Sequence, residues 1–140
     1  AIALWMSERL ATRRINHETI EMYRATYRDL ERPEVQEAFA LIEAMDAIAD
    51  KRGMRFAVVL WPLLESLDAY PFLDEHRRIK AELTQRGLST IDLLPLFEGE
   101  SESELHVHPT DHHPHELAHD RAARHIAEVM VGRGWVTVGQ

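Results

Sequence analysis

Two short apolar runs, separated by a helix-like segment, place the narrowest limit on the fold of this chain. Phe56–Leu60 has the sequence Phe-Ala-Val-Val-Leu and Ser89–Leu94 has Ser-Thr-Ile-Asp-Leu-Leu, and both suit strands covered on both faces. Pro62 ends the first run, because proline cannot donate to a strand ladder. Between the runs, Asp74 is placed to cap a helix that ends at Gly87. The sequence therefore predicts an α/β fold containing a strand-helix-strand unit, with the right-handed crossover usual for parallel strands.

Helical periodicity is predicted on both sides of this unit. Residues 1–53 form a helical leader, and Pro33 and Gly53 bound its strongest helix. Residues 95–140 hold a loop from Pro95 to Pro114 and a last helix that starts at Pro114, with His113 at the cap position, and ends at Gly132. The apolar positions of the leader are Leu4, Met6, Leu10, Ile20, Tyr23, Tyr27, Val35, Phe39, Ile42, Met45 and Ile48. Together with residues 54–94, these parts are interpreted as a single partial domain.

Composition and charge exclude several classes of function. The chain has 140 residues, 45% of them hydrophobic, and a net charge of −8 from 24 acidic and 16 basic residues. This acidity predicts no nucleic-acid partner, because the basic residues are not clustered. No apolar run approaches the roughly 20 residues that a membrane span needs, so no membrane partner is expected. With no cysteine, the compartment stays undetermined.

Two parallel strands are too few for a stable open sheet, since each needs neighbours for its backbone groups and layers on both faces. We therefore expect further strands to come from a missing N-terminal half or from a second copy of the chain. In a non-catalytic alternative, the helical leader covers the sheet edge of a second copy, and the protein is a self-associating module and a homodimer.

The densest cluster of ionisable groups follows the second strand and runs from His106 to His119. Loops beyond the carboxyl ends of parallel strands are where α/β proteins build their sites. Within the cluster, Asp111 precedes His113 by two residues, so its carboxylate can accept a hydrogen bond from one ring nitrogen and leave the other free as a base. Asp92, at the end of the second strand, is interpreted instead as an anchor for the following loop.

From Met54 to Met130 the sequence resembles the C-terminal half of the SGNH, or GDSL-type, serine hydrolases. The resemblance rests on three features: Leu60-Trp61-Pro62 at the end of the first strand, Ile91-Asp92-Leu93-Leu94-Pro95 at the second, and Asp111-His112-His113-Pro114 followed by Ala118-His119 and an Ala/Ile-rich helix. It implies a flavodoxin-like three-layer α/β fold, present only as its C-terminal half.

The resemblance also implies an activity. Asp111 and His113 would be the acid and base of a catalytic triad that hydrolyses a small-molecule ester or acyl substrate, with no cofactor. The family commonly has asparagine where this chain has His115, and its acid and base are more often separated by two residues than by one. His112 therefore remains open as an alternative base to His113.

The nucleophile of that family is absent from these residues. The family keeps its serine in a Gly-Asp-Ser motif, with a glycine and an asparagine on later loops that complete the oxyanion hole, and none of these is present. The five serines of this chain lack such a context: Ser7, Ser66, Ser89, Ser101 and Ser103. The simplest interpretation is that the serine comes from outside this sequence. On its own, the chain is expected to be inert toward esters.

A zinc-dependent hydrolase is the alternative enzyme. His115-Glu116-Leu117-Ala118-His119 fits His-Glu-x-x-His, in which His115 and His119 bind zinc and Glu116 is the base. The extended pattern has a glycine where this chain has Ala122. Because the helix continues, His125 lies roughly 120° around the axis from His119 and points away. His115 and His119 are therefore kept as the alternative metal ligands.

Overall fold

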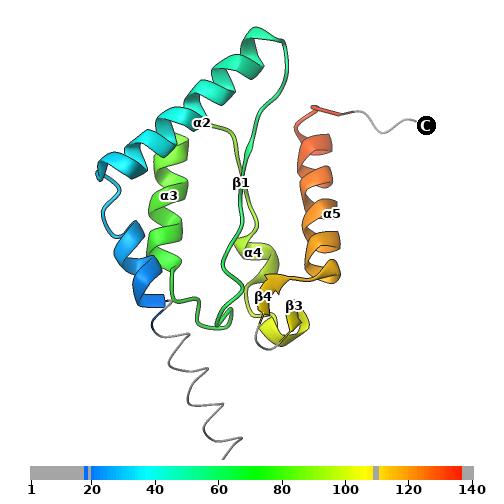
Figure 1. Cartoon of the computed structure of the whole chain (residues 1–140). Coiled ribbons are helices and arrows are strands. Elements are labelled where there is room, and N and C mark those ends of the chain that lie inside the picture. The colour runs from blue at the N-terminus through cyan, green and yellow to red at the C-terminus, as the bar shows by residue number, and fades with distance from the viewer. Residues whose placement is uncertain (1–17, 19, 109–110, 137–140) are drawn as a thin grey trace, which may run out of the picture.

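The computed structural model describes residue 18, residues 20–108 and residues 111–136. The expected helix with Leu4 and Leu10 lies outside these residues. Helices and short strands alternate, as the α/β prediction requires. Beyond a helical stretch at residues 20–27, the elements are α2 (Pro33–Lys51), β1 (Val58–Leu60), α3 (Leu73–Gln85), β2 (Thr90–Asp92), α4 (Leu94–Phe97), a 3₁₀ turn (Glu102–Glu104), β3 (His106–His108), β4 (Asp111–Pro114) and α5 (Glu116–Gly132) (Figure 1).

The predicted strand-helix-strand unit is confirmed. β1 and β2 pair in parallel, with Val59 opposite Ile91, and α3 connects them. Both strands are shorter than predicted, because the ladder begins only where the Val58 amide donates to the Ser89 carbonyl. At the other end Asp92 accepts a hydrogen bond from the Leu94 amide at 3.0 Å and turns the chain into α4. The loop-anchoring role expected of Asp92 is therefore confirmed.

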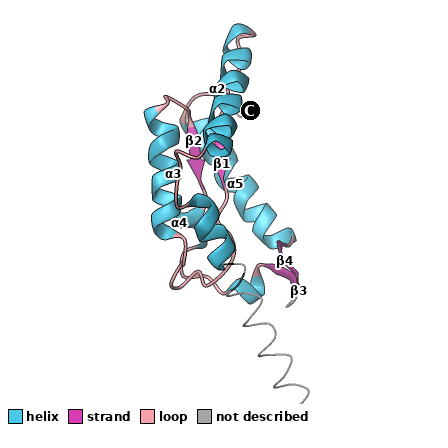
Figure 2. Ribbon diagram, turned by 60° about the vertical axis from the view of Figure 1, so that its left-hand side comes forward, coloured by secondary structure: helices cyan, strands magenta, loops and turns pink. Residues whose placement is uncertain are grey.

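Helices cover both faces of this strand pair. Figure 2 shows β1 and β2 between α3 on one side and α5 on the other. On the α3 side, Val58 packs against a cluster of Phe39, Leu83 and Leu88. On the α5 side lies a larger cluster of Leu64, Leu67, Ile91, Leu93, Phe97, Leu105, Ala118 and Ala122. The strand pair is thus the middle layer of three, and each face has its own apolar core.

Helix α2 begins at Pro33 as predicted, and it packs on α3 through one face only. Phe39 is 6% exposed against Leu83, whereas Met45 and Ile48 are 54% and 52% exposed. The expectation that Met45 and Ile48 share the packed face is wrong, because α3 covers only the part of α2 around Phe39. Gly53 follows the helix with φ +67°, the left-handed conformation that ends a helix at little cost for glycine.

A single arginine fixes α2 on α3. The Arg86 guanidinium donates to Gln36 Oε1 at 2.6 Å, to Glu43 Oε2 at 3.0 Å and to Glu82 Oε1 at 2.8 Å. It also lies 4.8 Å from the centre of the Phe39 ring. Polar and cation–π contacts therefore add to the apolar packing between the two helices.

Three predicted element boundaries are wrong. Asp74 does not cap α3, because the helix already begins at Leu73 and Asp74 lies in its first turn. The segment from Pro95 to Pro114 is not loop throughout, since it contains the β3–β4 hairpin and most of α4. His113 does not cap the last helix: Pro114 pairs in β4 with His106, and α5 starts two residues later.

None of the helices in the described ranges combines the length and the apolar character that crossing a bilayer demands.

We expect Phe97→Ala to lower the free energy of unfolding by about 3–5 kcal/mol, because it removes a ring that is completely buried beside Trp61. Leu41→Ala is the matched control: Leu41 is 60% exposed on α2, and its truncation should change stability by about 0.5 kcal/mol or less. Urea denaturation followed by circular dichroism measures both. Equal losses for the two variants would contradict the assignment of the core.

Candidate functional site

The β3–β4 hairpin carries most of the histidine cluster. Its strands are antiparallel, with His106 opposite Pro114 and His108 opposite Asp111. In Figure 1 the hairpin lies at the end of the molecule where β1 and β2 finish. The His115 amide donates to the Leu105 carbonyl at 2.8 Å, which closes the hairpin where α5 begins. The structure thus brings the sequence-predicted cluster to the carboxyl ends of the strands.

Two stacked histidines attach the hairpin to the loop after β1. His106 is 8% exposed, and its Nε2 is hydrogen-bonded to the Leu64 carbonyl. The His112 ring stacks on His106 with centroids 4.7 Å apart and planes 8° apart. His112 Nδ1 lies 3.0 Å from Glu65 Oε2. These contacts hold β4 at a defined position relative to β1.

Asp111 and His113 face each other. His113 Nδ1 lies 2.5 Å from Asp111 Oδ1, and the His113 amide donates to the same oxygen at 3.1 Å. A protonated Nδ1 donates to the carboxylate, which leaves Nε2 as the ring nitrogen able to accept a proton. The side chains are 86% and 47% exposed for His113 and Asp111, so the pair lies on the surface.

The His113 ring controls the ionisation of Asp111. The hydrogen bond from His113 Nδ1 is the main reason that the pKa of Asp111 lies below its ordinary value, and the His113 amide adds to the effect. Removal of the aspartate from water is a small opposing influence. The contact with His113 therefore favours the ionised form of Asp111.

A second Asp–His pair is buried at the end of β2. Asp92 Oδ1 lies 2.8 Å from Nε2 of His76, whose side chain is 5% exposed, and Asp92 Oδ2 lies 2.8 Å from Lys80 Nζ. Burial raises the pKa of Asp92, but hydrogen bonds from Lys80, His76 and the Leu94 amide outweigh it and leave the pKa below its ordinary value. The pair joins α3 to β2. Sequence reasoning missed His76, because nothing in the local pattern of α3 distinguishes it.

The two histidines of the zinc alternative have other partners. His115 is the N-cap of α5, and its Nδ1 accepts a hydrogen bond from the Leu117 amide at 3.1 Å. A neutral ring whose Nδ1 accepts carries its proton on Nε2, so this cap opposes metal binding through Nε2. The His119 ring lies 5.3 Å from that of Trp61. No group of three potential metal ligands occurs among the described residues, and zinc binding at His115 and His119 remains an untested prediction.

Ser66 is the serine nearest in sequence to the residues that hold the hairpin. It follows Leu64 and Glu65, and its φ of +49° is unusual for a residue other than glycine. Its carbonyl accepts a hydrogen bond from the Ala69 amide at 2.9 Å, as in a tight turn. In the described part of the chain no hydrogen bond joins Ser66 to His113. The turn accounts for its backbone, and it is not assigned as a nucleophile.

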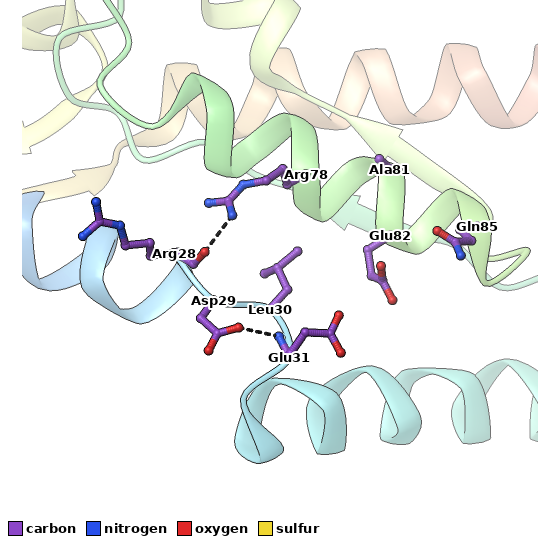
Figure 3. A pocket seen from close by; sticks show the side chains of 8 residues that line it. All are labelled: Arg28, Asp29, Leu30, Glu31, Arg78, Ala81, Glu82 and Gln85. Carbon is purple, nitrogen blue, oxygen red and sulfur yellow. Dashed lines mark hydrogen bonds between the residues drawn. The ribbon is translucent and has the colours of Figure 1, made fainter.

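An open groove lies between α3 and the turn before α2 (Figure 3). Arg78 crosses it and donates to the carbonyl oxygens of Arg28, at 2.7 Å, and Tyr27, at 3.2 Å. Both terminal nitrogens of the Arg78 guanidinium are thus bonded to backbone carbonyls. The Arg28 side chain points away from the groove, and Glu31 and Glu82 line it. Its polar groups do not converge, so we do not assign it as the site.

Comparison with known proteins found no family model, no curated protein and no solved structure that matches this chain.

The Asp92 pair gives a test of stability against pH. Asp92→Asn should lower the free energy of unfolding at neutral pH by about 2–3 kcal/mol, because it leaves buried His76 without a carboxylate. The folded-state pKa of Asp92 is depressed, so its contribution is complete above the ordinary carboxyl range and fades as the pH falls through the folded pKa.

Urea unfolding between pH 7 and pH 3 should therefore show wild type and Asp92→Asn converging below about pH 4. Asp120→Asn, which loses an exposed pair with Arg124, is the control and should have little effect throughout. A stability difference for Asp92→Asn that does not change with pH would contradict the assigned pair.

The Asp111 pair gives a test by titration. A carbon-13 NMR titration of the Asp111 carboxyl should have its midpoint below the ordinary aspartate pKa, because His113 stabilises the ionised form. In His113→Ala the midpoint should move up toward the ordinary value, with the remaining difference due to the amide of residue 113, which alanine keeps. His125→Ala, on α5, should leave it unchanged. A midpoint insensitive to His113 would show that the two side chains do not interact in solution.

Proposed function

We propose that this chain supplies the general base and its orienting acid to a serine hydrolase of the SGNH type. The observation that carries the proposal is the contact between Asp111 Oδ1 and His113 Nδ1 at 2.5 Å, which leaves Nε2 available. The serine that attacks the ester or acyl carbonyl comes from polypeptide outside these residues.

Each member of the pair has a defined part in this chemistry. His113 Nε2 takes the proton of the serine hydroxyl as its oxygen bonds to the carbonyl carbon, and then gives it to the leaving group. Asp111 holds the ring in the tautomer with the proton on Nδ1 and stabilises the imidazolium that forms. Its lowered pKa supports this part, because the aspartate stays ionised throughout.

His113 rather than His112 is the base in this proposal. His113 is the histidine that contacts Asp111, whereas His112 pairs with Glu65 and stacks on His106. His112 therefore contributes by holding β4 in place. This division of labour between adjacent histidines follows from the alternation of side chains along β4, which sends neighbours to opposite faces.

The finer fold proposal is the C-terminal half of a flavodoxin-like domain. It is supported by the middle layer of parallel strands, by α2 and α3 on one face with α5 on the other, and by the position of the hairpin beyond the carboxyl ends of the strands. Active sites of open α/β sheets are found at that end.

The exposure of His113 supports a nucleophile from elsewhere. At 86% exposure the His113 ring is open to solvent, and no described residue forms a wall that could hold an acyl group against it. Catalysis of acyl transfer needs oriented donors for the oxyanion in a site from which water is excluded. In this proposal the covering polypeptide brings the serine, the oxyanion hole and the acyl pocket together.

The isolated chain is expected to lack serine esterase activity, so it should show no fluorophosphonate-sensitive hydrolysis of p-nitrophenyl acetate. Extending expression upstream of Ala1 in the gene should add a Gly-Asp-Ser motif after an apolar strand and give an active esterase. In that enzyme His113→Ala and Asp111→Asn should each lower kcat by about 10⁴-fold.

His112→Ala should lower kcat by about 100-fold or less, well short of the loss in His113→Ala, because it displaces β4 without removing the base. His125→Ala is the control for general effects of substitution. An upstream region without such a serine, or hydrolysis that survives His113→Ala, would overturn the proposed function.

A further inference from the structure

One edge of the β1–β2 pair has no partner strand among the described residues. The Val58 amide and the Leu60 carbonyl point toward β2, where they bond Ser89 and Leu93 at 2.8 Å and 3.0 Å. Backbone groups alternate in direction along a strand, so those of Val59 point to the opposite edge. No described strand pairs with that edge, and the Val59 side chain is 40% exposed.

The far edge of β2 is different, because α5 covers part of it. Arg133, the C-cap of α5, donates to the Thr90 carbonyl at 2.8 Å and to Ser89 Oγ at 2.7 Å. An arginine bound to an outward carbonyl protects a sheet edge against pairing with another strand. The β1 edge has no comparable cover from described residues, so the two edges have different roles.

The path of the chain into β1 is that of a crossover connection. Arg24 Nη2 donates to the Pro71 carbonyl at 2.9 Å, and Tyr23 makes an edge-to-face contact with Phe72 at 6.1 Å. Pro71 and Phe72 belong to the loop that leaves the carboxyl end of β1. From the helical stretch at residues 20–27, which contacts this loop, the chain rises through α2 to the amino end of the sheet and descends into β1 (Figure 1).

The topology of this connection identifies the occupant of the unpaired edge. Both α2 and α3 pack on the same face of the sheet, around Phe39 and Leu83. The connection through α3 advances from β1 to β2, and right-handed crossovers on one face all advance in the same direction. A strand that leads into α2 therefore belongs beside β1, on the side away from β2.

We propose that the unpaired edge of β1 is a docking surface for one more parallel β-strand, carried by a polypeptide segment that precedes the helical leader of residues 1–53. The inference rests on the sheet topology and not on the proposed function. Its consequence for that function is that the carboxyl end of the docked strand comes to the same end of the sheet as Asp111 and His113. A second copy of the chain is the less suitable occupant, because each copy carries a net charge of −8.

A labelled strand peptide tests the docking surface. The probe is a peptide with the sequence of residues 56–60 between lysine pairs, carrying a fluorophore, and its anisotropy is followed as the full 140-residue chain is added. Saturable binding is expected. Val59→Pro should weaken it by about tenfold or more, because proline removes the outward amide without touching the bonds to β2. Val59→Thr, which keeps that amide, should bind within about threefold of wild type.

Amide hydrogen exchange on the wild-type chain gives a second measurement that does not depend on how the variants fold. The peptide should slow exchange at Val59 and leave Val58, already bonded to Ser89, unchanged. In the double variant Trp5→Phe/Trp135→Phe, Trp61 is the one remaining tryptophan. Because Trp61 directly follows β1, energy transfer from it should be stronger to an acceptor at the carboxyl end of the peptide than to one at the amino end.

Three results would overturn the inference. One is the absence of saturable binding at millimolar peptide, and another is equal binding by Val59→Pro and wild type. The third is a dimer of the chain, seen by light scattering, that Val59→Pro dissociates, since a second copy would then occupy the edge. Stronger transfer to the amino-terminal acceptor would contradict the parallel orientation. None of these outcomes depends on His113, so they are separable from failure of the proposed hydrolase.

Discussion

The parallel pairing of β1 with β2 is the constraint on which the rest of the structure depends. Three paired positions, from Val58 with Thr90 to Leu60 with Asp92, bring the two carboxyl ends to one end of the sheet. The loop after β1 and the hairpin after α4 must then meet, and the contacts of His106 with Leu64 and of His112 with Glu65 fix how they meet. The Asp111–His113 pair therefore owes the end of the sheet at which it lies to the pairing of β1 with β2, and its place on the hairpin to the pairing of β4 with β3.

The two Asp–His pairs of this protein show how environment separates a structural role from a chemical one. Asp92 is 13% exposed, and its two oxygens are occupied by His76 and Lys80 of α3. A substrate can therefore reach neither Asp92 nor the bonded nitrogen of His76 without breaking the contact between β2 and α3. The Asp111–His113 pair has the same residue types at the surface, where the His113 side chain is 86% exposed. Only the second arrangement leaves a proton acceptor for another molecule.

The sequence predicted part of what depends on local chemistry, although the caps expected at Asp74 and His113 were wrong. Pro33 and Gly53 mark α2 because their backbone preferences act within a few residues, and the Asp111–His113 contact spans only two positions. Long-range packing was not predictable. The hairpin was missed because its histidines lack apolar alternation and are held by Leu64 and Glu65, more than forty positions earlier in the chain. Met45 and Ile48 fit the period of α2, but α3 covers only the part of the helix around Phe39.

The unpaired edge of β1 and the exposure of His113 are two consequences of one geometry. A strand added beside β1 would extend the sheet on the side away from β2, and the loop beyond its carboxyl end would project over the same surface as the hairpin. Covering the dyad in this way would lower the local dielectric and strengthen the Asp111–His113 interaction, while solvent screens it in the arrangement described. An imidazole base in open water has little advantage over free imidazole, because its effect depends on a nucleophile held within reach. The same addition that satisfies the backbone of Val59 would therefore create the surroundings in which His113 can act.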